Sequence, residues 1–350
     1  MKGKYFLIVI ILLLWSSNIL KAESIYVDCI NGNDKSKGTE KYPIATLNRA
    51  AEIVNAGVAD EETIIRLAPG IYYMAKTAEF TNQRNYSEHK RLILEAAILP
   101  GDSTWAPDKM PVIMSIASPE TYFFDNRMVT WDLKFEISHV TVCGLKFLGN
   151  PTPHNRHSSI RRHGKNLTDL LVTQCIFVGD MEALPLHLGI IANGHKTVVD
   201  HCIFYGCQNS VVFWEADSNY SYNNAMRYCI VKNNATSAVW TCMTANDFEF
   251  HHNIISGCKY FWMRQPYNKE EYKIEDCIVT NNTFYCGIWN LPENLPEDFK
   301  YMEKNVSKEG VIELILSTNR VPLNVTNDYL HIQKDKFGYN IGAGIFLDDK

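Results

Sequence analysis

A short motif recurs along the middle of the chain, and its spacing limits the possible fold more than any other feature. The motif is a Cys or Asn followed by two apolar residues, and it occurs at Cys175, Cys202, Cys229, Asn253 and Cys277. Successive motifs lie 27, 27, 24 and 24 residues apart. Such a period indicates a solenoid, in which each unit buries its apolar face only against its neighbours.

Each repeat has the composition of β-strands. Val, Ile, Phe, Tyr and Thr dominate the repeats, and Gly and Asn interrupt them without an apolar stripe at the helical period. In the repeat from Lys196 to Glu215, short strands are expected at residues 197–201, 203–205 and 211–214. The sequence therefore predicts coils of three short strands each.

The Cys or Asn of each motif lies between the first two strands of its coil. Asn tolerates a left-handed turn and can form ladders along a stack, so this position is expected at an inner turn. Ten cysteines in an exported chain suggest disulfides. The regular spacing instead favours a column of stacked free thiols, and a disulfide between Cys202 and Cys207 stays open.

The first 22 residues have the organisation of a secretory leader. Lys2 and Lys4 precede an apolar run from Phe6 to Trp15, and Leu20-Lys21-Ala22 fits a cleavage site. The run has about ten residues, whereas a membrane span needs about 20. We therefore expect an exported protein, in the periplasm, at the cell surface or outside the cell, without a transmembrane segment.

Composition excludes several classes of protein. Hydrophobic residues make up 46% of the chain and charged residues 21%, which is enough apolar material for a sizeable core. The formal charge is −5, and it becomes more negative when the three leader lysines are removed. A general polyanion binder is thus excluded, and we expect no nucleic acid partner and a monomer.

The head and tail of the mature chain resemble a known family. The resemblance is carried by these segments: Ile25-Tyr26-Val27-Asp28, Asn31-Gly32-Asn33-Asp34, Gly38-Thr39, Pro43-Ile44-Ala45-Thr46-Leu47, residues 64–72 and residues 338–344. They are similar to secreted right-handed parallel β-helix proteins with the pectate-lyase-like fold, common in polysaccharide-degrading bacteria. The resemblance implies an all-β solenoid with an N-terminal capping helix, but that scaffold serves lyases, hydrolases, epimerases and non-enzymatic proteins.

A single domain is expected over residues 23–350. Its cap and first strands would occupy residues 23–75, regular coils about 137–290, and an irregular C-terminal segment 291–350, with residues 80–125 irregular as well. Within the cap, Thr46 can begin a helix from Leu47 to Asn55 that ends at Ala56-Gly57. Such a helix would cover the open end of the coil stack.

A cationic segment is the first candidate site. Residues 137–168 contain no Asp or Glu but include the cations Arg156 and Lys165, and Arg161, Arg162 and His163 lie where a third strand is expected. Because side chains alternate along a strand, Arg161 and His163 would share one face and Arg162 the other. Arginine forks match carboxylate geometry, so an acidic polysaccharide is the expected ligand, and a solvated basic turn is the alternative. His187 occupies the equivalent stretch of the next coil.

A row of tryptophans is the second candidate site. They recur on the third strands of successive coils, at Trp214, Trp240, Trp262 and Trp289. Exposed indoles stack on the apolar faces of sugars, whereas the alternative is that the rings fill the coil interior. Tyr220, Tyr222 and Tyr267 lie in the long turns that follow those strands.

Three functional classes remain open. A polysaccharide lyase needs a base beside a uronate carboxylate and a cation that stabilises the developing charge. For such lyases the resemblance implies a Lys, Arg or His base, often with Ca²⁺ held by acidic residues. The acidic residues available for Ca²⁺ are few and scattered, at Asp180, Glu182, Glu215 and Asp217.

A glycoside hydrolase would need two carboxylates across the scissile bond, and the same four residues are its candidates. A non-catalytic glycan-binding protein would use the tryptophans and arginines alone. The lyase is favoured. The catalytic candidates are Arg161, His163, His187 and Glu215, and the substrate-binding candidates are Arg162, Lys165, Trp214, Asp217, Trp262 and Arg264.

Overall fold

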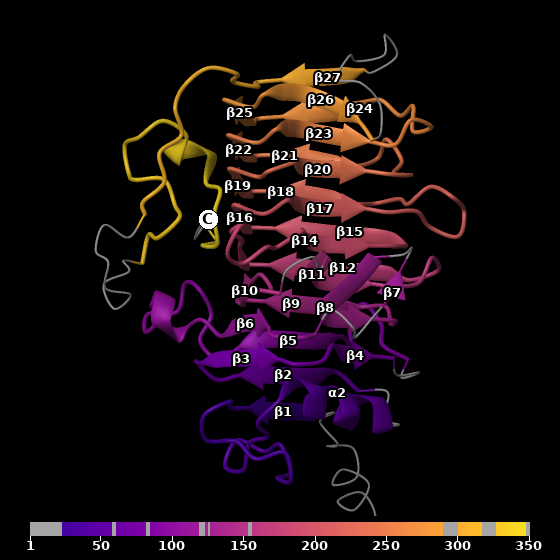
Figure 1. The fold of residues 1–350 in the computed structure, drawn as a ribbon, viewed down its shortest axis with the longest axis vertical. Helices are drawn as coiled ribbons and strands as arrows, with labels where there is room; N and C mark the ends of the chain where they lie inside the picture. The colour runs from indigo at the N-terminus through magenta and orange to yellow at the C-terminus, as the bar shows by residue number, and fades with distance from the viewer. Residues whose placement is uncertain are drawn as a thin grey trace, which may run out of the picture.

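Three sheets run side by side along an elongated stack in the computed structural model (Figure 1). The structure describes residues 23–57, 61–81, 85–118, 123–124, 127–152, 156–289, 300–316 and 327–347. The expected leader lies outside these residues. Within them, no helix has the length and apolar character that crossing a membrane requires.

The ten-stranded sheet is parallel throughout. Its strands, in spatial order, are β1 (Glu23–Val27), β2 (Thr63–Leu67), β5 (Leu92–Ala96), β9 (Val140–Cys143), β12 (Thr168–Thr173), β15 (His195–Asp200), β18 (Ala225–Arg227), β21 (Glu249–His251), β24 (Tyr272–Glu275) and β27 (Tyr301–Lys304). Neighbours in this sheet are one coil apart in the chain.

The second sheet has eight parallel strands. They are β3 (Ile71–Met74), β6 (Val112–Ser115), β10 (Lys146–Leu148), β13 (Ile176–Val178), β16 (Ile203–Tyr205), β19 (Ile230–Lys232), β22 (Ile254–Ser256) and β25 (Ile278–Thr280). Most of these strands have three residues, as expected for residues 203–205.

The nine-stranded sheet carries the longest strand. In order along the stack it contains β4 (Ala78–Phe80), β8 (Arg127–Phe135), β11 (Arg156–Arg162), β14 (Leu188–Ala192), β17 (Asn209–Phe213), β20 (Ser237–Thr241), β23 (Tyr260–Arg264) and β26 (Phe284–Ile288). The remaining strand, β7 (Phe123–Phe124), pairs antiparallel with β8. From β2 to β26, β7 aside, each coil contributes one strand to each sheet, so the chain forms a parallel β-helix, as the repeat predicted.

The turn between the first two strands of a coil explains the repeated motif. One residue of each turn has a left-handed φ between 49° and 53°, at Gln174, His201, Tyr228, His252 and Asp276. The next residue is the motif Cys or Asn, whose side chain is buried inside the coil. All ten cysteines are free, which confirms the thiol column and excludes a Cys202–Cys207 disulfide.

The interior of the stack is built from ladders of like residues. Phe147, Phe177 and Phe204 stack in successive coils with ring centroids 4.9 and 4.6 Å apart and nearly parallel planes. The strands pair in register, so residues at equivalent positions of successive coils lie next to each other. Each interior residue therefore packs between its counterparts in the coils above and below. The core is therefore one continuous column along the stack.

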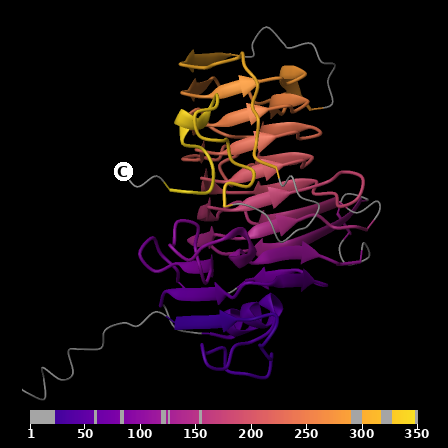
Figure 2. The same ribbon diagram turned by 90° about the vertical axis from the view of Figure 1, so that its left-hand side faces the viewer.

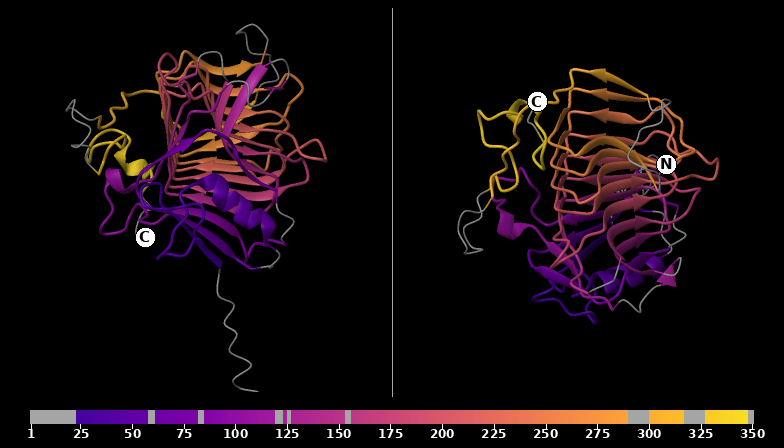
Figure 3. Two further views of the ribbon diagram at one scale, coloured as in Figure 1. Left: turned by 60° about the horizontal axis from the view of Figure 1, so that its bottom comes forward. Right: turned by 45° about the horizontal axis from the view of Figure 1, so that its top comes forward.

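The expected helix is present as α2 (Leu47–Ala56). The Thr46 side chain accepts a hydrogen bond from the Arg49 amide, and Leu47, Ala50, Ala51 and Val54 form the buried face of the helix. Figure 3 shows α2 at the N-terminal end of the stack. Two short 3₁₀ turns, Pro107–Lys109 and Tyr339–Ile341, are the other helical elements among the described residues.

Regular structure begins earlier than expected. Residues 80–125 contribute β5 and β6 to two of the sheets, and β8 begins at Arg127, before the predicted start of the coils near residue 137. Pro107 and Pro111 lie between β5 and β6 and interrupt the chain only locally. The prediction of an irregular segment was wrong because the long connection between β5 and β6 interrupts the sequence period by which these strands would be recognised.

The C-terminal segment lies over the eight-stranded sheet (Figure 2). It packs on an outward row of isoleucines, one from each of five coils; the cluster contains Ile176, Ile203, Ile230, Ile254, Ile278, Ile312, Leu330, Ile332 and Ile345. The Gly344 amide also donates to the carbonyl of Tyr228, at 3.0 Å. The outer face of the eight-stranded sheet is thus covered along these coils.

Candidate ligand-binding groove

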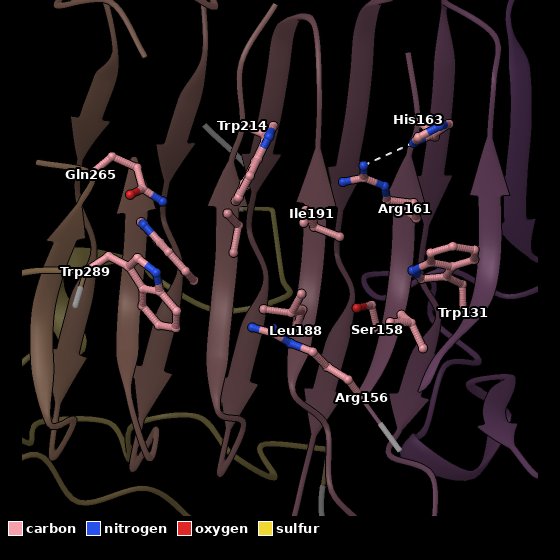
Figure 4. A pocket seen from close by; sticks show the side chains of 13 residues that line it. Trp131, Arg156, Ser158, Arg161, His163, Leu188, Ile191, Trp214, Gln265 and Trp289 are labelled. Carbon is pink, nitrogen blue, oxygen red and sulfur yellow. Dashed lines mark hydrogen bonds between the residues drawn. The ribbon is translucent and has the colours of Figure 1, made fainter. Parts of the chain in front are cut away.

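A cavity of about 330 Å³ lies on the outer face of the nine-stranded sheet (Figure 4). Its volume is in the range of small-ligand sites. The lining combines aromatic, aliphatic and cationic side chains, from Val129, Trp131, Arg156, Ser158, Arg161, His163, Leu188, Ile191, Val212, Trp214, Trp240, Gln265 and Trp289. We call this cavity the groove.

Arg161 and His163 form the cationic end of the groove. They share one face of the sheet, as predicted, and Arg161 Nη2 lies 3.1 Å from His163 Nδ1. A guanidinium only donates hydrogen bonds, so Nδ1 of His163 accepts this one and Nε2 carries the proton of the neutral ring. Figure 4 shows both side chains on the same side of the groove.

The Arg161 guanidinium has no anionic partner among the described residues. Burial lowers its pKa to about 10, and Nη1 is buried without a hydrogen-bond partner among the described residues. Buried N–H groups normally have an acceptor, so Nη1 can donate to a group that enters the cavity. The neighbouring Lys134 differs, because it lies 3.3 Å from Glu79 and 2.8 Å from Glu136.

The pKa of His163 is lowered from its usual value. Burial is the largest cause, and the charges of Arg161 and Lys134 act in the same direction, while Glu136 opposes them. The imidazole is therefore neutral near pH 7, which is the form that can accept a proton.

Three tryptophans and Gln265 form the aromatic end of the groove. The ring centroids of Trp240 and Trp289 lie 4.8 Å apart at an interplanar angle of 31°, and those of Trp214 and Trp240 lie 6.2 Å apart at 69°. Leu188, Val212 and Met263 pack around them on the outer face of the sheet. This end therefore presents indole faces to a ligand.

Register explains how residues from distant coils meet in the groove. Arg161 pairs with Ile191, Ile191 with Val212, and Val212 with Trp240. These residues form one outward row across four strands, because parallel in-register pairing keeps equivalent positions on one face.

Several residues that line the groove were not expected from the sequence. Trp131, on β8, lies outside the expected coils, and Ser158 and Ile191 were not considered. Arg156 was counted only as one cation of residues 137–168. The available signal was the strand register: Trp131 pairs with Ser158, and Ser158 with Leu188. Gln265 was also missed, although it follows the same strand as Trp262 and Arg264.

Three predicted substrate-binding residues are inside the coil instead. Trp262 is 0% exposed, Arg162 0% and Arg264 2%. The Trp262 indole donates to Thr241 Oγ1 at 2.9 Å and stacks on Tyr272. Because side chains facing the interior cannot reach a ligand in the groove, the predictions for these three residues were wrong.

His187 also lies apart from the groove lining. Its Nδ1 accepts a hydrogen bond from the backbone amide of His157 at 3.1 Å. Burial, with the nearby His157 and Arg156, lowers the pKa of His187 to about 4. The ring therefore has a structural partner, and the geometry does not join it to Arg161 and His163.

Lys165, Glu215 and Asp217 lie in turns that follow the nine-stranded sheet. Lys165 Nζ is 2.5 Å from Glu215 Oε1, and Asp217 Oδ1 is 3.3 Å from His195 Nε2. They are brought together in the turns, but they are not part of the groove lining. Both carboxylates already have cationic or hydrogen-bonding neighbours.

The described residues contain no group of three or more His, Cys, Asp or Glu side chains placed to hold a metal ion. Asp180, a candidate for Ca²⁺, instead uses Oδ1 to accept the amides of Glu182 and Ala183, which are 2.9 and 3.1 Å away. These contacts are those of an ordinary turn. We therefore derive no chemistry from Ca²⁺.

Comparison with known proteins gives only distant structural likenesses. No family model and no curated protein matches the chain. A GH136 lacto-N-biosidase from Eubacterium ramulus aligns over 87% of this chain and 71% of its own, at 8% identity and a TM-score of 0.39. A rhamnogalacturonan lyase aligns over 93% and 100%, at 12% identity and a TM-score of 0.35.

The pectin methylesterase from Aspergillus niger aligns over 83% of this chain and 86% of its own, at 11% identity and a TM-score of 0.41. Identities and TM-scores this low carry no argument about function. The assignment as a parallel β-helix rests on the three sheets of this chain itself.

Proposed function

We propose that this protein binds an acidic glycan in the groove and cleaves it by β-elimination. The observation that carries the proposal is the half-buried Arg161 guanidinium at one end of a tryptophan-lined groove. Its Nη1 has no hydrogen-bond partner among the described residues, and its Nη2 donates to His163. The indoles supply surfaces on which sugar rings stack, and the guanidinium supplies a partner for a uronate carboxylate.

Binding would begin with the carboxylate. A carboxylate accepting from Arg161 Nη1 satisfies a donor that has no partner among the described residues. This charge-assisted hydrogen bond withdraws electrons from the carboxyl group, which acidifies the proton on the adjacent carbon. Arg161 would thus serve both binding and activation.

His163 is the base in this scheme. Its Nδ1 carries the basic lone pair of the ring, and this lone pair accepts a hydrogen bond from Arg161 Nη2 when no ligand is bound. When the carboxylate draws the guanidinium toward itself, Nδ1 becomes available for the proton. Binding of the carboxylate to Arg161 thereby frees His163 Nδ1 to act as the base, because one hydrogen bond joins the two side chains.

The elimination breaks a C–H bond and a C–O bond of the glycan. Nδ1 takes the proton from the carbon next to the carboxylate, and that electron pair forms a carbon–carbon double bond. The bond to the glycosidic oxygen on the following carbon breaks, and this oxygen takes a proton from water. The products are an unsaturated uronate end and a new reducing end, and His163 returns its proton to solvent.

Hydrolysis by paired carboxylates has less support. No Asp or Glu occurs among the described residues that line the groove. Glu215 and Asp217, the strongest candidates from sequence, have Lys165 and His195 as partners in the turns. A retaining or inverting glycosidase needs both carboxyl groups at the scissile bond.

The experiment is incubation with a panel of uronate-containing and neutral glycans, following ultraviolet absorbance of the unsaturated product and the release of reducing ends. We expect both signals to rise together on an acidic glycan. His163→Ala should lower the rate by about 10²- to 10⁴-fold, the range for loss of a general base.

Glu215→Gln and Asp217→Asn are the matched controls, and they should change the rate less than about twofold. Reducing ends without absorbance, lost in Glu215→Gln, would instead establish hydrolysis. Binding of an acidic glycan without any product would leave a glycan-binding protein and contradict the elimination step.

A further inference from the structure

The two ends of the groove differ in chemistry. The cationic end has Arg161 and His163 on or just after β11, whereas the aromatic end has Trp214, Trp240 and Trp289. Gln265 supplies an amide at the aromatic end, and the side chain of Arg156, which comes from β11, extends past Leu188 toward this end in Figure 4. Figure 4 shows Arg161 and His163 on the opposite side of the groove from Gln265 and Trp289.

The two ends are far enough apart to contact different parts of one ligand. Neighbouring strands lie about 4.8 Å apart, so Arg161 on β11 and Trp240 on β20, three strands away, are separated by about 14 Å. One acidic group therefore cannot contact both ends.

The aromatic end also has an unused hydrogen-bond donor. Trp240 Nε1 is buried without a partner among the described residues, and the Gln265 side chain is only 8% exposed. Buried donors normally have an acceptor, so this indole N–H points to a ligand oxygen. A sugar hydroxyl or an amide carbonyl would satisfy it.

We propose that the ligand is a mixed glycan, in which neutral sugars are linked to acidic ones, and that the aromatic end is the subsite for a neutral sugar. The inference rests on the proposed function, because it takes Arg161 as the carboxylate subsite. The neutral ring would stack on the indoles of Trp240 and Trp289 while its oxygens meet Trp240 Nε1 and Gln265.

The test compares oligosaccharides of equal length by isothermal titration calorimetry. The mixed probes are hyaluronan, heparosan, glucuronoxylan and rhamnogalacturonan oligosaccharides, and the acidic probes are oligogalacturonate, oligomannuronate and oligoguluronate. We expect the tightest ligand to be a mixed probe, with a dissociation constant at least about tenfold below that of any acidic probe.

Two tryptophans of the groove make a matched pair of variants. Trp289→Ala, at the aromatic end, should remove the preference for the mixed probe and leave binding of acidic probes within about twofold. Trp131→Ala lies at the cationic end and should weaken both kinds of probe alike. Trp214→Ala provides a second variant of the aromatic end should Trp289→Ala fail to fold by circular dichroism.

The possible failures are distinguishable. If an acidic probe binds tightest and Trp289→Ala weakens all probes equally, the neutral subsite is wrong while the proposed function stands. If neutral oligosaccharides bind as tightly as charged ones and Arg161→Gln changes nothing, the proposed function itself fails, and this inference fails with it.

Discussion

Two adjacent arginines on β11 have opposite environments. Arg161 lines the groove, whereas Arg162 is fully buried and donates to the Asn193 carbonyl and to Thr197 Oγ1, both at 2.6 Å. Burial lowers the pKa of Arg162 to about 9, so the surroundings already disfavour its charge. Strand alternation alone places one side chain in the ligand site and the next in the core.

We predict unequal effects on stability from two substitutions of Arg162. Arg162→Ala should lower the free energy of unfolding by about 2–4 kcal/mol, because it leaves a cavity and unpaired polar groups. Arg162→Met fills the space without a charge and should stay within about 1 kcal/mol of the original protein. Urea denaturation followed by circular dichroism measures both, and equal losses would contradict a desolvated charge at this position.

The proposed base predicts a defined pH dependence. The pKa of His163 is depressed, so the neutral form persists to below the usual value of 6.5 and is lost as the pH falls further. The cleavage rate should therefore fall on the acid side only at a pH below 6.5.

Lys134→Gln removes one of the charges that depress this pKa and leaves Glu136 to raise it. The acid limb of the rate profile should then move to higher pH while its plateau changes little. Rate measurements from pH 4 to 8 test this, and an unmoved acid limb would assign the titration to another group.

At the scale of strands and turns, the repeating motif acts through the column it forms. Asn253 replaces a cysteine and binds both neighbours: Cys229 N donates to its Oδ1 at 2.9 Å, and its Nδ2 donates to the Met226 carbonyl at 2.8 Å. Its own amide donates to Cys277 Sγ at 3.4 Å. Asn253 Oδ1 and Cys277 Sγ thus each accept the turn amide of the preceding coil.

This interchange predicts how Asn253 responds to substitution. Asn253→Ala removes an acceptor and a donor from a buried turn and should cost about 2–3 kcal/mol. Asn253→Cys restores an acceptor and should recover at least half of that loss. Thermal unfolding of the two variants compares them, and equal stabilities would show that the column contributes only packing.

Sequence reasoning found the coils but not every strand face. The period, the thiol column and the third strand at Arg161 follow from local composition, and all agree with the structure. Trp262 was misplaced because turn lengths vary: it pairs with Val239, an interior residue, whereas Trp240 is the next residue along β20 and faces outward. A shift of one residue along a strand moves a side chain to the opposite face of the sheet, and the repeat length alone does not fix the position of a residue that closely.

The same limit applies to the groove as a whole. Arg161 and His163 were correctly paired because they are two residues apart at the end of β11, where the alternation of the strand still holds. Trp131 and Trp289 come from coils that lie far apart in the chain, and only the three-dimensional register joins them.

At the scale of the molecule, two sheets have different outer faces. The C-terminal segment covers the isoleucine row of the eight-stranded sheet, while the groove occupies the nine-stranded sheet. An uncovered isoleucine row would be a large apolar surface, which soluble proteins rarely expose. The segment therefore belongs to the folded core.

We expect the covering segment to stabilise the fold without affecting the groove. Ile345→Ala, a change at a fully buried position, should lower the free energy of unfolding by about 2–4 kcal/mol. Leu347→Ala, at a 53% exposed position, is the matched control and should change it by less than about 0.5 kcal/mol. Loss of glycan affinity in folded Ile345→Ala would contradict separate roles for the two sheets.

The most direct test of the acidic-glycan groove is the affinity of the tightest charged oligosaccharide for Arg161→Gln, measured by calorimetry at low and high salt. Arg66→Gln removes the same charge from the ten-stranded sheet, where Arg66 lies 2.8 Å from Glu95, and serves as the control. Loss of the carboxylate partner should weaken binding about 10- to 100-fold and reduce its salt dependence. Equal affinities for Arg161→Gln and Arg66→Gln would contradict a carboxylate site at Arg161.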